Sequence, residues 1–330
     1  MADLRDVIDA ALELSVVGSF SNLGYEIRRR MDDWADPPPG ALRGRTVLIT
    51  GPTSGLGRAA SEAFAALGAR LVLVGRDAEK LIATRAELVS AYPDVEAATV
   101  VADMSSLASV SEAVDVVRAS ETRLDVLIDN AGVINHRRIV TADGLEATFA
   151  TMVVGPFRLI SGLLPLLRGS REARVISVTS GGMYAQQLDL DDLGYERGEF
   201  DGTRAYARAK RAQVALVREW ARRLGPPSDS GIAVNAMHPG WAATPGLAAS
   251  LPAFSRVMGP ILRTPAAGID TLVWLASAYD AGKCTGRLYL DRRPRPFDRA
   301  PITRLSAGDR RRLWDAVVTA AKVEDPLPDR

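Results

Sequence analysis

Two side chains on one expected helix have the types and spacing of a proton-transfer pair. Tyr206 and Lys210 stand four residues apart in a helical stretch, residues 203–224, so they share one face of that helix. A group that transfers a proton to or from a substrate oxygen works best when its pKa lies near the operating pH, and a free tyrosine, with a pKa of about 10, exchanges protons poorly at neutral pH. A neighbouring ammonium stabilises the phenolate and lowers that pKa. The alternative is a solvated helix face, because Tyr-x-x-x-Lys is common by chance.

A serine at the end of a preceding strand completes this expected constellation. Residues 174–179 form a β-branched run, with Ser177 inside it and Ser180 at its carboxyl end. Ligands of parallel sheets bind at the carboxyl ends of the strands, so Ser180 is the candidate that hydrogen-bonds a substrate oxygen. The alternative is a turn serine that bonds its own backbone.

A glycine-rich turn near the start of the chain has the form of a phosphate cradle. It follows the strand expected at residues 46–50 and leads into the helix expected at residues 57–67. Glycines permit a tight turn and a close backbone approach, and the helix N-terminus attracts a pyrophosphate. The candidate cofactor contacts in this turn are Gly51, Thr53, Ser54, Gly55, Leu56 and Gly57. The alternative is a purely structural strand-to-helix turn.

Short apolar strands alternate with helices from residue 46 to residue 290. The strands are expected at residues 46–50, 71–74, 98–101, 124–128, 174–179, 233–237 and 287–290. The helices between them are expected at residues 57–67, 78–91, 105–120, 144–167 and 203–224. This alternation predicts βαβ units, and hence an α/β fold with a doubly wound, Rossmann-type parallel sheet of about seven strands. No internal linker interrupts the pattern, so residues 44–290 are predicted to be one domain.

The first 43 residues are expected to form a helical extension and a linker. Residues 1–34 place apolar side chains at helical spacing, and Gly18 and Gly24 are expected to break the pattern into one helix and a second, short helix. Residues 36–40, Asp-Pro-Pro-Pro-Gly, cannot continue a helix and are predicted to be a linker.

Residues 291–330 form a second extension, an Arg/Pro-rich segment followed by a last helix. Ser306 and Asp309 predict a capping box at the start of that helix. Residues 1–34 contain four basic and seven acidic side chains, whereas residues 291–330 contain ten basic and seven acidic ones. These opposite charges suggest the hypothesis that the two extensions lie against each other.

Composition excludes several other functions. The 330 residues are 47% hydrophobic and 25% charged, which predicts a packed globular core. A net charge of +1 argues against nucleic acid as a partner. One cysteine, Cys284, and two histidines argue against an internal disulfide and a metal site. No apolar run reaches about 18 residues and no secretory signal is visible, so a cytoplasmic protein without a membrane span is expected.

Together these motifs resemble those of the short-chain dehydrogenase/reductase superfamily, over about residues 44–290. The resemblance implies an oxidoreductase in which Ser180, Tyr206 and Lys210 are catalytic, with Lys210 also holding the nicotinamide ribose. It also implies that Asp103 touches the adenine ring. The remaining cofactor contacts that it implies are Met104, Asn130, Ala131, Gly132, Pro239, Gly240 and Thr244.

Longer stretches resemble the dehydrogenase/reductase "family member 12" group, at residues 174–183, 200–206 and 237–246. One position departs from the superfamily: Met152 stands where an asparagine is usual, three residues before a glycine. In the superfamily the backbone carbonyl there holds a water of the proton relay, and methionine retains only that carbonyl. The departure motivates an alternative function, a cofactor-binding sensor or scaffold with weak catalysis.

The end of the second strand indicates which nicotinamide cofactor is preferred. An acidic residue there would hold a ribose 2′-hydroxyl and favour NAD, whereas Arg76 suits the 2′-phosphate of NADP. The superfamily's other basic signal would precede the second glycine of the turn, where this chain has Ser54. The alternative is an ordinary surface arginine.

The segment between Trp241 and Leu262 indicates the substrate class. It carries Leu247, Leu251, Phe254, Val257, Met258 and Ile261. In the superfamily this segment covers the substrate, so its apolar side chains predict an apolar alcohol or carbonyl compound; plain packing is the alternative.

His238 is expected to be structural, because Tyr206 already serves as acid and base. Many superfamily members pair as homodimers, so a homodimer is a further expectation.

Overall fold

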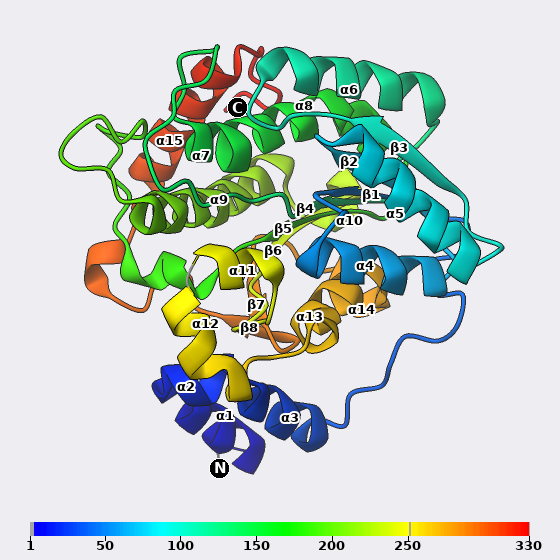
Figure 1. Ribbon diagram of the computed structural model, residues 1–330, viewed down its shortest axis with the longest axis vertical. Coiled ribbons are helices and arrows are strands. Elements are labelled where there is room, and N and C mark those ends of the chain that lie inside the picture. Colours follow the sequence, from blue (N-terminus) through cyan, green and yellow to red (C-terminus); the bar gives the residue numbers. More distant parts are fainter. Residues whose placement is uncertain (1–2, 251, 330) are drawn as a thin grey trace.

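One eight-stranded sheet organises the part of the chain that the computed structural model describes, residues 3–250 and 252–329 (Figure 1). Its order is β3-β2-β1-β4-β5-β6-β7-β8. The strands are β1 (Thr46–Thr50), β2 (Arg70–Gly75), β3 (Ala97–Val101), β4 (Val126–Asp129), β5 (Ala173–Val178), β6 (Ile232–Met237), β7 (Leu288–Leu290) and β8 (Arg293–Arg295). Strands β1 to β7 run parallel, and β8 pairs with β7 in the antiparallel direction. The predicted doubly wound α/β fold is confirmed, and β8 carries the sheet past residue 290.

Helices cover both faces of this sheet, which explains why its central strands β1, β5 and β6 are buried along their whole length. One face holds α6 (Leu107–Ser120), α8 (Gly155–Arg168) and α9 (Gly202–Leu224). The other face holds α4 (Gly55–Ala66), α5 (Ala78–Ala91) and α13 (Pro265–Ser277), and two short helices, α10 (Pro227–Ser230) and α14 (Tyr279–Gly282), join later elements. The strand order reverses between β1 and β4, so their carboxyl ends open a crevice of the kind that binds ligands in such folds.

The N-terminal extension forms three helices, α1 (Leu4–Leu14), α2 (Val16–Phe20) and α3 (Asn22–Met31). The expected breaks at Gly18 and Gly24 are wrong: the helices end at Ser15 and Ser21 instead, and the Ser15 hydroxyl caps α2 by accepting from the Gly18 N–H at 3.0 Å. Gly24 lies inside α3, where a Cβ would collide with the Gly18 carbonyl oxygen. Glycine here allows two helices to touch rather than ending one.

Helix α1 packs on the domain through its acidic side. Asp9 is buried and pairs with Arg28 at 2.7 Å and with Arg295 at 2.6 Å. Although burial opposes the effect, Arg295 and Arg28 lower the pKa of Asp9 to about 2. The apolar stripe of α1 faces outward instead, with Leu4 70% and Leu14 89% exposed.

The two oppositely charged extensions do lie against each other, as hypothesised, through residues 291–299. Arg293 pairs with Asp32 at 2.7 Å, and Arg299 pairs with Glu13. The last helix, α15 (Ala307–Ala321), lies elsewhere, against α8 and α9, and the predicted capping box at Ser306 is confirmed. Its Trp314 is fully buried, with ring centroids 4.8 Å from Phe157 and 4.7 Å from Trp220.

Residues Ala147–Arg168 form the one helix among the described residues that is long and apolar enough, by length and composition, to span a membrane. It consists of α7 (Ala147–Phe149), a π-helical turn (Ala150–Val154) and α8, and it begins at the N-cap Glu146. In its most apolar window 67% is buried inside the protein, so packing accounts for its apolar character.

Replacing Trp314 tests how far α15 stabilises the domain. Trp314→Ala is expected to lower the free energy of unfolding by about 3–5 kcal/mol, because truncating a buried aromatic loses contacts and leaves a cavity. Urea unfolding followed by circular dichroism measures the change. Asp315→Ala, an exposed neighbour on the same helix, is the control, and equal stability of both variants would show that α15 is not part of the core.

Candidate active site

The glycine turn between β1 and α4 presents an open helix N-terminus. Gly51 and Gly55 adopt left-handed backbone conformations, with φ of +68° and +54°, which favour glycine. Ser54 is the N-cap of α4, yet its hydroxyl does not bond the first N–H groups of the helix. Those groups and the helix dipole therefore remain available to an anion, as a pyrophosphate cradle requires.

Asn130 and Ala131 form the floor of this turn. Asn130 Nδ2 donates to the carbonyl oxygens of Thr50 at 2.9 Å and Gly51 at 3.3 Å. A Cβ on Gly57 would lie 2.6 Å from the same nitrogen, and a Cβ on Gly51 would lie 3.2 Å from Ala131 Cα. These glycines are required because the ends of β1 and β4 meet directly under the turn.

Loops after β4 and β6 border the same space. A Cβ on Gly55 would lie 3.3 Å from Thr244 Cβ, so the loop that carries Pro239, Gly240 and Thr244 reaches the glycine turn. A Cβ on Gly132 would lie 3.9 Å from the Nζ atom of Lys210. The structure therefore brings the predicted cofactor contacts and the predicted catalytic lysine to one edge of the sheet.

The carboxyl ends of β2 and β3 lie along the same edge of the sheet, beyond β1. Gly75 and Val101 pair in the sheet, so Arg76 and Asp103 follow neighbouring strand ends. Arg76 is exposed and makes no ion pair within residues 3–250 and 252–329. Asp77, the acidic neighbour, is occupied as the cap of α5, where it accepts from the Lys80 N–H at 3.1 Å.

Asp103 is partly buried and already ordered by its own loop. Its Oδ1 accepts from the N–H of Ser105 at 2.8 Å and from the Ser105 hydroxyl at 2.7 Å. Met104 is buried next to it, and its carbonyl oxygen occupies the space where Gly155 would carry a Cβ. This loop is fixed by contacts with α8 before any ligand arrives.

The pair Tyr206 and Lys210 lies on α9, where the lysine reaches back to the sheet. Lys210 is 2% exposed, and its Nζ donates to the Val178 carbonyl at 2.7 Å and lies 5.6 Å from the Tyr206 ring centroid. Thr179 Oγ1 donates to the Lys210 carbonyl at 3.1 Å, a second link between β5 and α9. Burial raises the pKa of Tyr206, and a hydrogen bond with Ser180 opposes that rise.

Ser180 and Ser177 occupy different environments. Ser177 is buried within β5, whereas Ser180 is half-buried at the strand's end, and its Oγ accepts from the Gly182 N–H at 3.3 Å. That bond caps a short 3₁₀ helix, Gly181–Ala185. The alternative role as a turn serine is therefore real, and it coexists with the contact to Tyr206.

Asp129 is a functional candidate that sequence reasoning missed. It ends β4, is 2% exposed, and its Oδ2 accepts from Gln213 Nε2 at 2.9 Å. Burial raises the pKa of Asp129 to about 6 and lowers that of Lys210 to about 8, and each charge partly offsets the other's shift. No ion pair joins Asp129 and Lys210 within residues 3–250 and 252–329, so each charge acts on the other over a longer distance. The available signal was an acidic residue directly before Asn130, at the end of a buried strand.

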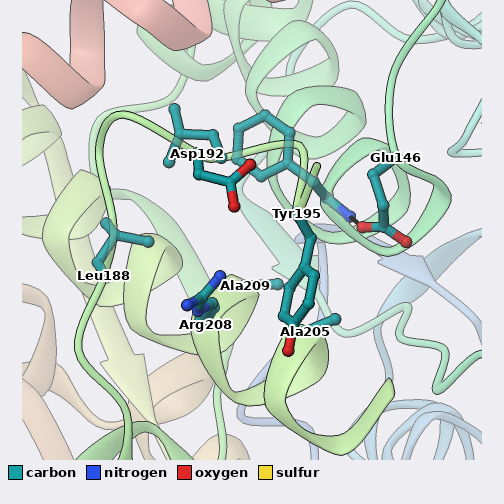
Figure 2. A pocket seen from close by; sticks show the side chains of 9 residues that line it. Glu146, Leu188, Asp192, Tyr195, Ala205, Arg208 and Ala209 are labelled. Carbon is teal, nitrogen blue, oxygen red and sulfur yellow. Dashed lines mark hydrogen bonds between the residues drawn. The ribbon is translucent and has the colours of Figure 1, made fainter. Parts of the chain in front are cut away.

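A small pocket lies against the neighbouring face of α9 (Figure 2). The Arg208 guanidinium stacks over the Tyr195 ring with its carbon 4.6 Å from the centroid. Asp192 lines the same pocket, so the segment between Ser180 and α9 lies along this helix.

Most of the sheet and the candidate site lie within a region that matches a known protein family. The family described as short chain dehydrogenase matches residues 45–253, which include β1, the glycine turn, Ser180, Tyr206 and Lys210. The chain belongs to the short-chain dehydrogenase family.

Individual family members resemble this dehydrogenase over most of its length. Human dehydrogenase/reductase SDR family member 12 is 40% identical over 254 residues, 77% of this chain and 78% of the relative. Mouse retinol dehydrogenase 14 is 33% identical over 300 residues, 84% of this chain and 86% of the relative. The crystal structure of an uncharacterized Mycobacterium paratuberculosis protein superposes with a TM-score of 0.70 at 27% identity, covering 89% of this chain and 99% of that one.

Membership makes this dehydrogenase a hydride-transfer oxidoreductase that acts on CH–OH or C=O groups with a nicotinamide cofactor. The residues present fit such a cofactor, because the uncapped N-terminus of α4 lies beside Gly51 and Gly55, whose missing side chains leave the space that a pyrophosphate needs. Arg76 and Asp103 would flank its adenosine half.

Two further positions show how this dehydrogenase differs locally. Met152 is fully buried in the π-helical turn, and its Sδ would lie 3.9 Å from a Cβ on Gly132. His238 is also fully buried, and burial, together with Arg263 and other arginines, lowers its pKa well below the usual value. A neutral histidine packed edge-to-face with Phe20 at 4.6 Å fits the predicted structural role.

Replacing Asp129 tests whether it supports the charge on Lys210. Asp129→Asn removes a negative charge that favours the ammonium, so the pKa of Lys210 falls further below about 8. The alkaline limb of the kcat/KM profile for carbonyl reduction is expected to move down by about one pH unit, the lower end of the usual effect of a nearby charge.

The control is Asp125→Asn, a buried carboxylate just before the amino end of β4 that accepts from the Thr46 N–H at 2.8 Å. Its alkaline limb is expected to stay in place. Identical limbs in both variants and the wild type would contradict a role for Asp129 in holding the charge of Lys210.

Proposed function

We propose that this protein is an NADP(H)-dependent oxidoreductase that transfers a hydride between the nicotinamide and an apolar alcohol or carbonyl compound. The observation that carries the proposal is the meeting of Tyr206, Lys210 and Ser180 at the carboxyl edge of the sheet, beside the glycine turn. If the glycine turn were purely structural and Tyr206 and Lys210 lay on a solvated helix face, a buried lysine beside the turn would not be expected.

Each of the three side chains has a distinct task. The bound cofactor supplies or accepts the hydride. Tyr206 transfers the proton to or from the substrate oxygen; burial raises its pKa, so the phenol is protonated before reduction, and donating the proton requires the phenolate to be stabilised. Ser180 donates a hydrogen bond to the same oxygen, and the Lys210 ammonium stabilises the phenolate that the tyrosine becomes.

The preference for NADP rests on Arg76. Its guanidinium is exposed at the end of β2, and the neighbouring carboxylate of Asp77 is engaged by α5. A guanidinium pairs bidentately with a phosphate, whereas an NAD-preferring site needs a free carboxylate for the ribose.

The apolar substrate class rests on the segment after β6. It forms α11 (Pro245–Ser250), α12 (Pro252–Met258) and a short 3₁₀ helix (Gly259–Ile261), while Leu251 lies outside the described residues. Trp241 packs edge-to-face with Phe254 at 5.2 Å, and Val257 is 75% exposed. An apolar cover favours an apolar ligand, in keeping with a relative named retinol dehydrogenase.

A substrate panel tests the reaction. NADPH oxidation across lipophilic ketones and aldehydes is expected for the wild type, and Tyr206→Phe is expected to lose about 10²–10⁴-fold in kcat/KM, the usual worth of a positioned acid. Tyr279→Phe, which changes an exposed tyrosine on α14, is the control and should match the wild type. Equal turnover by the wild type and Tyr206→Phe would refute the assignment.

A cofactor comparison tests the choice of NADP. Arg76→Ala is expected to raise KM for NADPH at least about tenfold while leaving KM for NADH nearly unchanged, because a charge-assisted pair is worth about 1.5–3 kcal/mol. Arg118→Ala, at an exposed arginine in the last turn of α6, should change neither constant. A parallel loss for both cofactors would mean that Arg76 does not read the 2′-phosphate.

Met152 favours a second candidate, a protein that binds NADP and signals its redox state with little turnover. It occupies the position where the superfamily's proton relay usually has an amide side chain, and it is fully buried. Micromolar NADPH binding together with no turnover across the whole panel would favour this candidate over the oxidoreductase.

A further inference from the structure

The ring of Phe20, at the end of α2, packs on the segment that carries Ser180. Phe20 is 4% exposed although it belongs to the N-terminal extension. A Cβ on Gly181 would lie only 2.6 Å from the Phe20 ring, so glycine at that position is required by this contact. Any movement of the ring would therefore change the packing around Gly181, the residue directly after Ser180.

The backbone of Phe20 is bonded to the loop that follows β6. Its carbonyl oxygen accepts from the Trp241 N–H at 2.8 Å, and a Cβ on Gly240 would lie 2.7 Å from that oxygen. The ring also packs edge-to-face against His238 at 4.6 Å and Trp241 at 5.9 Å. One residue thus contacts both segments that flank the expected nicotinamide and substrate positions.

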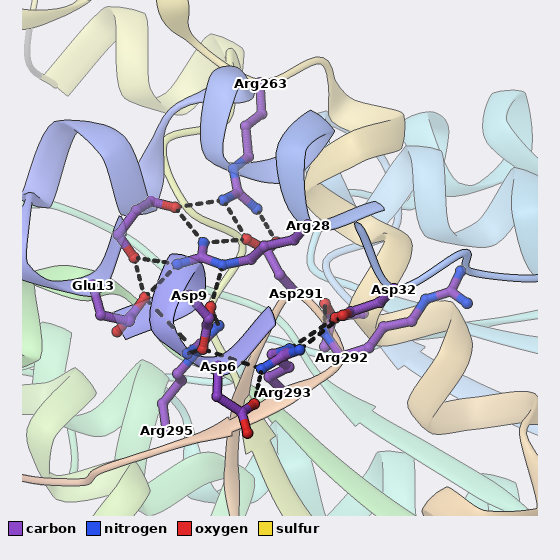
Figure 3. Close-up of polar contacts among 12 residues, drawn as sticks. Asp6, Asp9, Glu13, Arg28, Asp32, Arg263, Asp291, Arg292, Arg293 and Arg295 are labelled. Atoms are coloured by element: carbon purple, nitrogen blue, oxygen red, sulfur yellow. Dashed lines mark hydrogen bonds and ion pairs between the residues drawn. The ribbon is translucent and has the colours of Figure 1, made fainter. Parts of the chain in front are cut away.

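A buried ion cluster fixes the end of α2 (Figure 3). Arg28, Arg263 and Asp291 are each 1% exposed or less, and Asp291 pairs with Arg28 at 2.7 Å and with Arg263 at 2.5 Å. The Ser19 carbonyl accepts from both guanidiniums, at 3.1 and 2.8 Å. Buried charges are costly unless all partners are in place, so the cluster holds α2 in one position.

The same cluster ties down the segment that covers the substrate side. Arg263 Nε donates to the Phe20 carbonyl at 3.0 Å, and the Arg263 N–H donates to the Trp241 carbonyl at 2.7 Å. The Ala243 N–H in turn donates to the Arg263 carbonyl at 2.9 Å. Both ends of residues 244–262 are therefore joined where α2 ends.

We propose that the N-terminal extension is part of the active site, with Phe20 as a positioning residue that aligns the Ser180 segment with the Pro239–Gly240 loop. Phe20 does not touch the reacting atoms; it sets the distance between the two segments that hold them. The expected loss of kcat/KM rests on the proposed function, whereas the expected loosening of the two segments does not. It confines the effect to the nicotinamide and substrate half, because the glycine turn, Arg76 and Asp103 lie outside these contacts.

The test is Phe20→Ala in the full-length protein, with Val17→Ala as the matched control, since Val17 lies on the same helix and is 48% exposed. Phe20→Ala is expected to lose at least tenfold in kcat/KM for the carbonyl substrate. Its Kd for adenosine 2′,5′-bisphosphate, which occupies only the adenosine half, is expected to stay within twofold of the wild type. Val17→Ala should match the wild type in both measurements, and Phe20→Leu, which keeps most of the bulk, should recover part of the lost kcat/KM.

Hydrogen exchange supplies a readout that needs no activity. Amides in residues 180–184 and 238–243 are expected to exchange faster in Phe20→Ala, while those of β1 stay protected. Unchanged exchange in these segments, or an unchanged kcat/KM in an active protein, would overturn the proposal. If Phe20→Ala fails to fold, the same two measurements on Phe20→Leu decide, with smaller changes in the same direction expected. A wild type without turnover would count against the proposed function alone.

Discussion

A buried ammonium is the constraint on which the catalytic side of this protein depends. The Lys210 ammonium is stabilised inside the fold by the hydrogen bond that it donates to the Val178 carbonyl and by the negative charge of Asp129. Those two partners lie at the ends of neighbouring strands β5 and β4, so the lysine fixes α9 against the carboxyl edge of the sheet. Tyr206, one turn earlier on α9, is positioned by the same attachment.

The parts of the site that could be predicted from sequence are those in which local spacing carries the chemistry. The glycines of the turn, the four-residue step from Tyr206 to Lys210, and the position of Ser180 at a strand end each follow from the geometry of a single element. The alternation of strands and helices also predicted the sheet. β8 was missed because a three-residue strand of arginine and proline, Arg293–Arg295, has no apolar pattern.

What could not be predicted depends on partners distant in the sequence. Asp129 looked like any acidic residue after a strand, and its importance arises only because α9 brings Lys210 over it. The docking face of α1 could not be predicted for a related reason: periodicity shows that a helix has two faces, not which face a cluster of arginines elsewhere will attract. Seven acidic residues among the first 34 were a better guide to its docking than the apolar stripe.

The glycine that follows the serine has a consequence for the docking of the N-terminal extension. Gly181 has no left-handed backbone conformation, so its lack of a side chain is explained by the aromatic ring above it and not by the turn itself. The two positions are therefore sterically coupled in this chain: a larger residue at position 181 and a phenylalanine ring at position 20 cannot occupy the same space. A helix docked here by an aromatic ring thus needs the residue after the strand-end serine to lack a side chain.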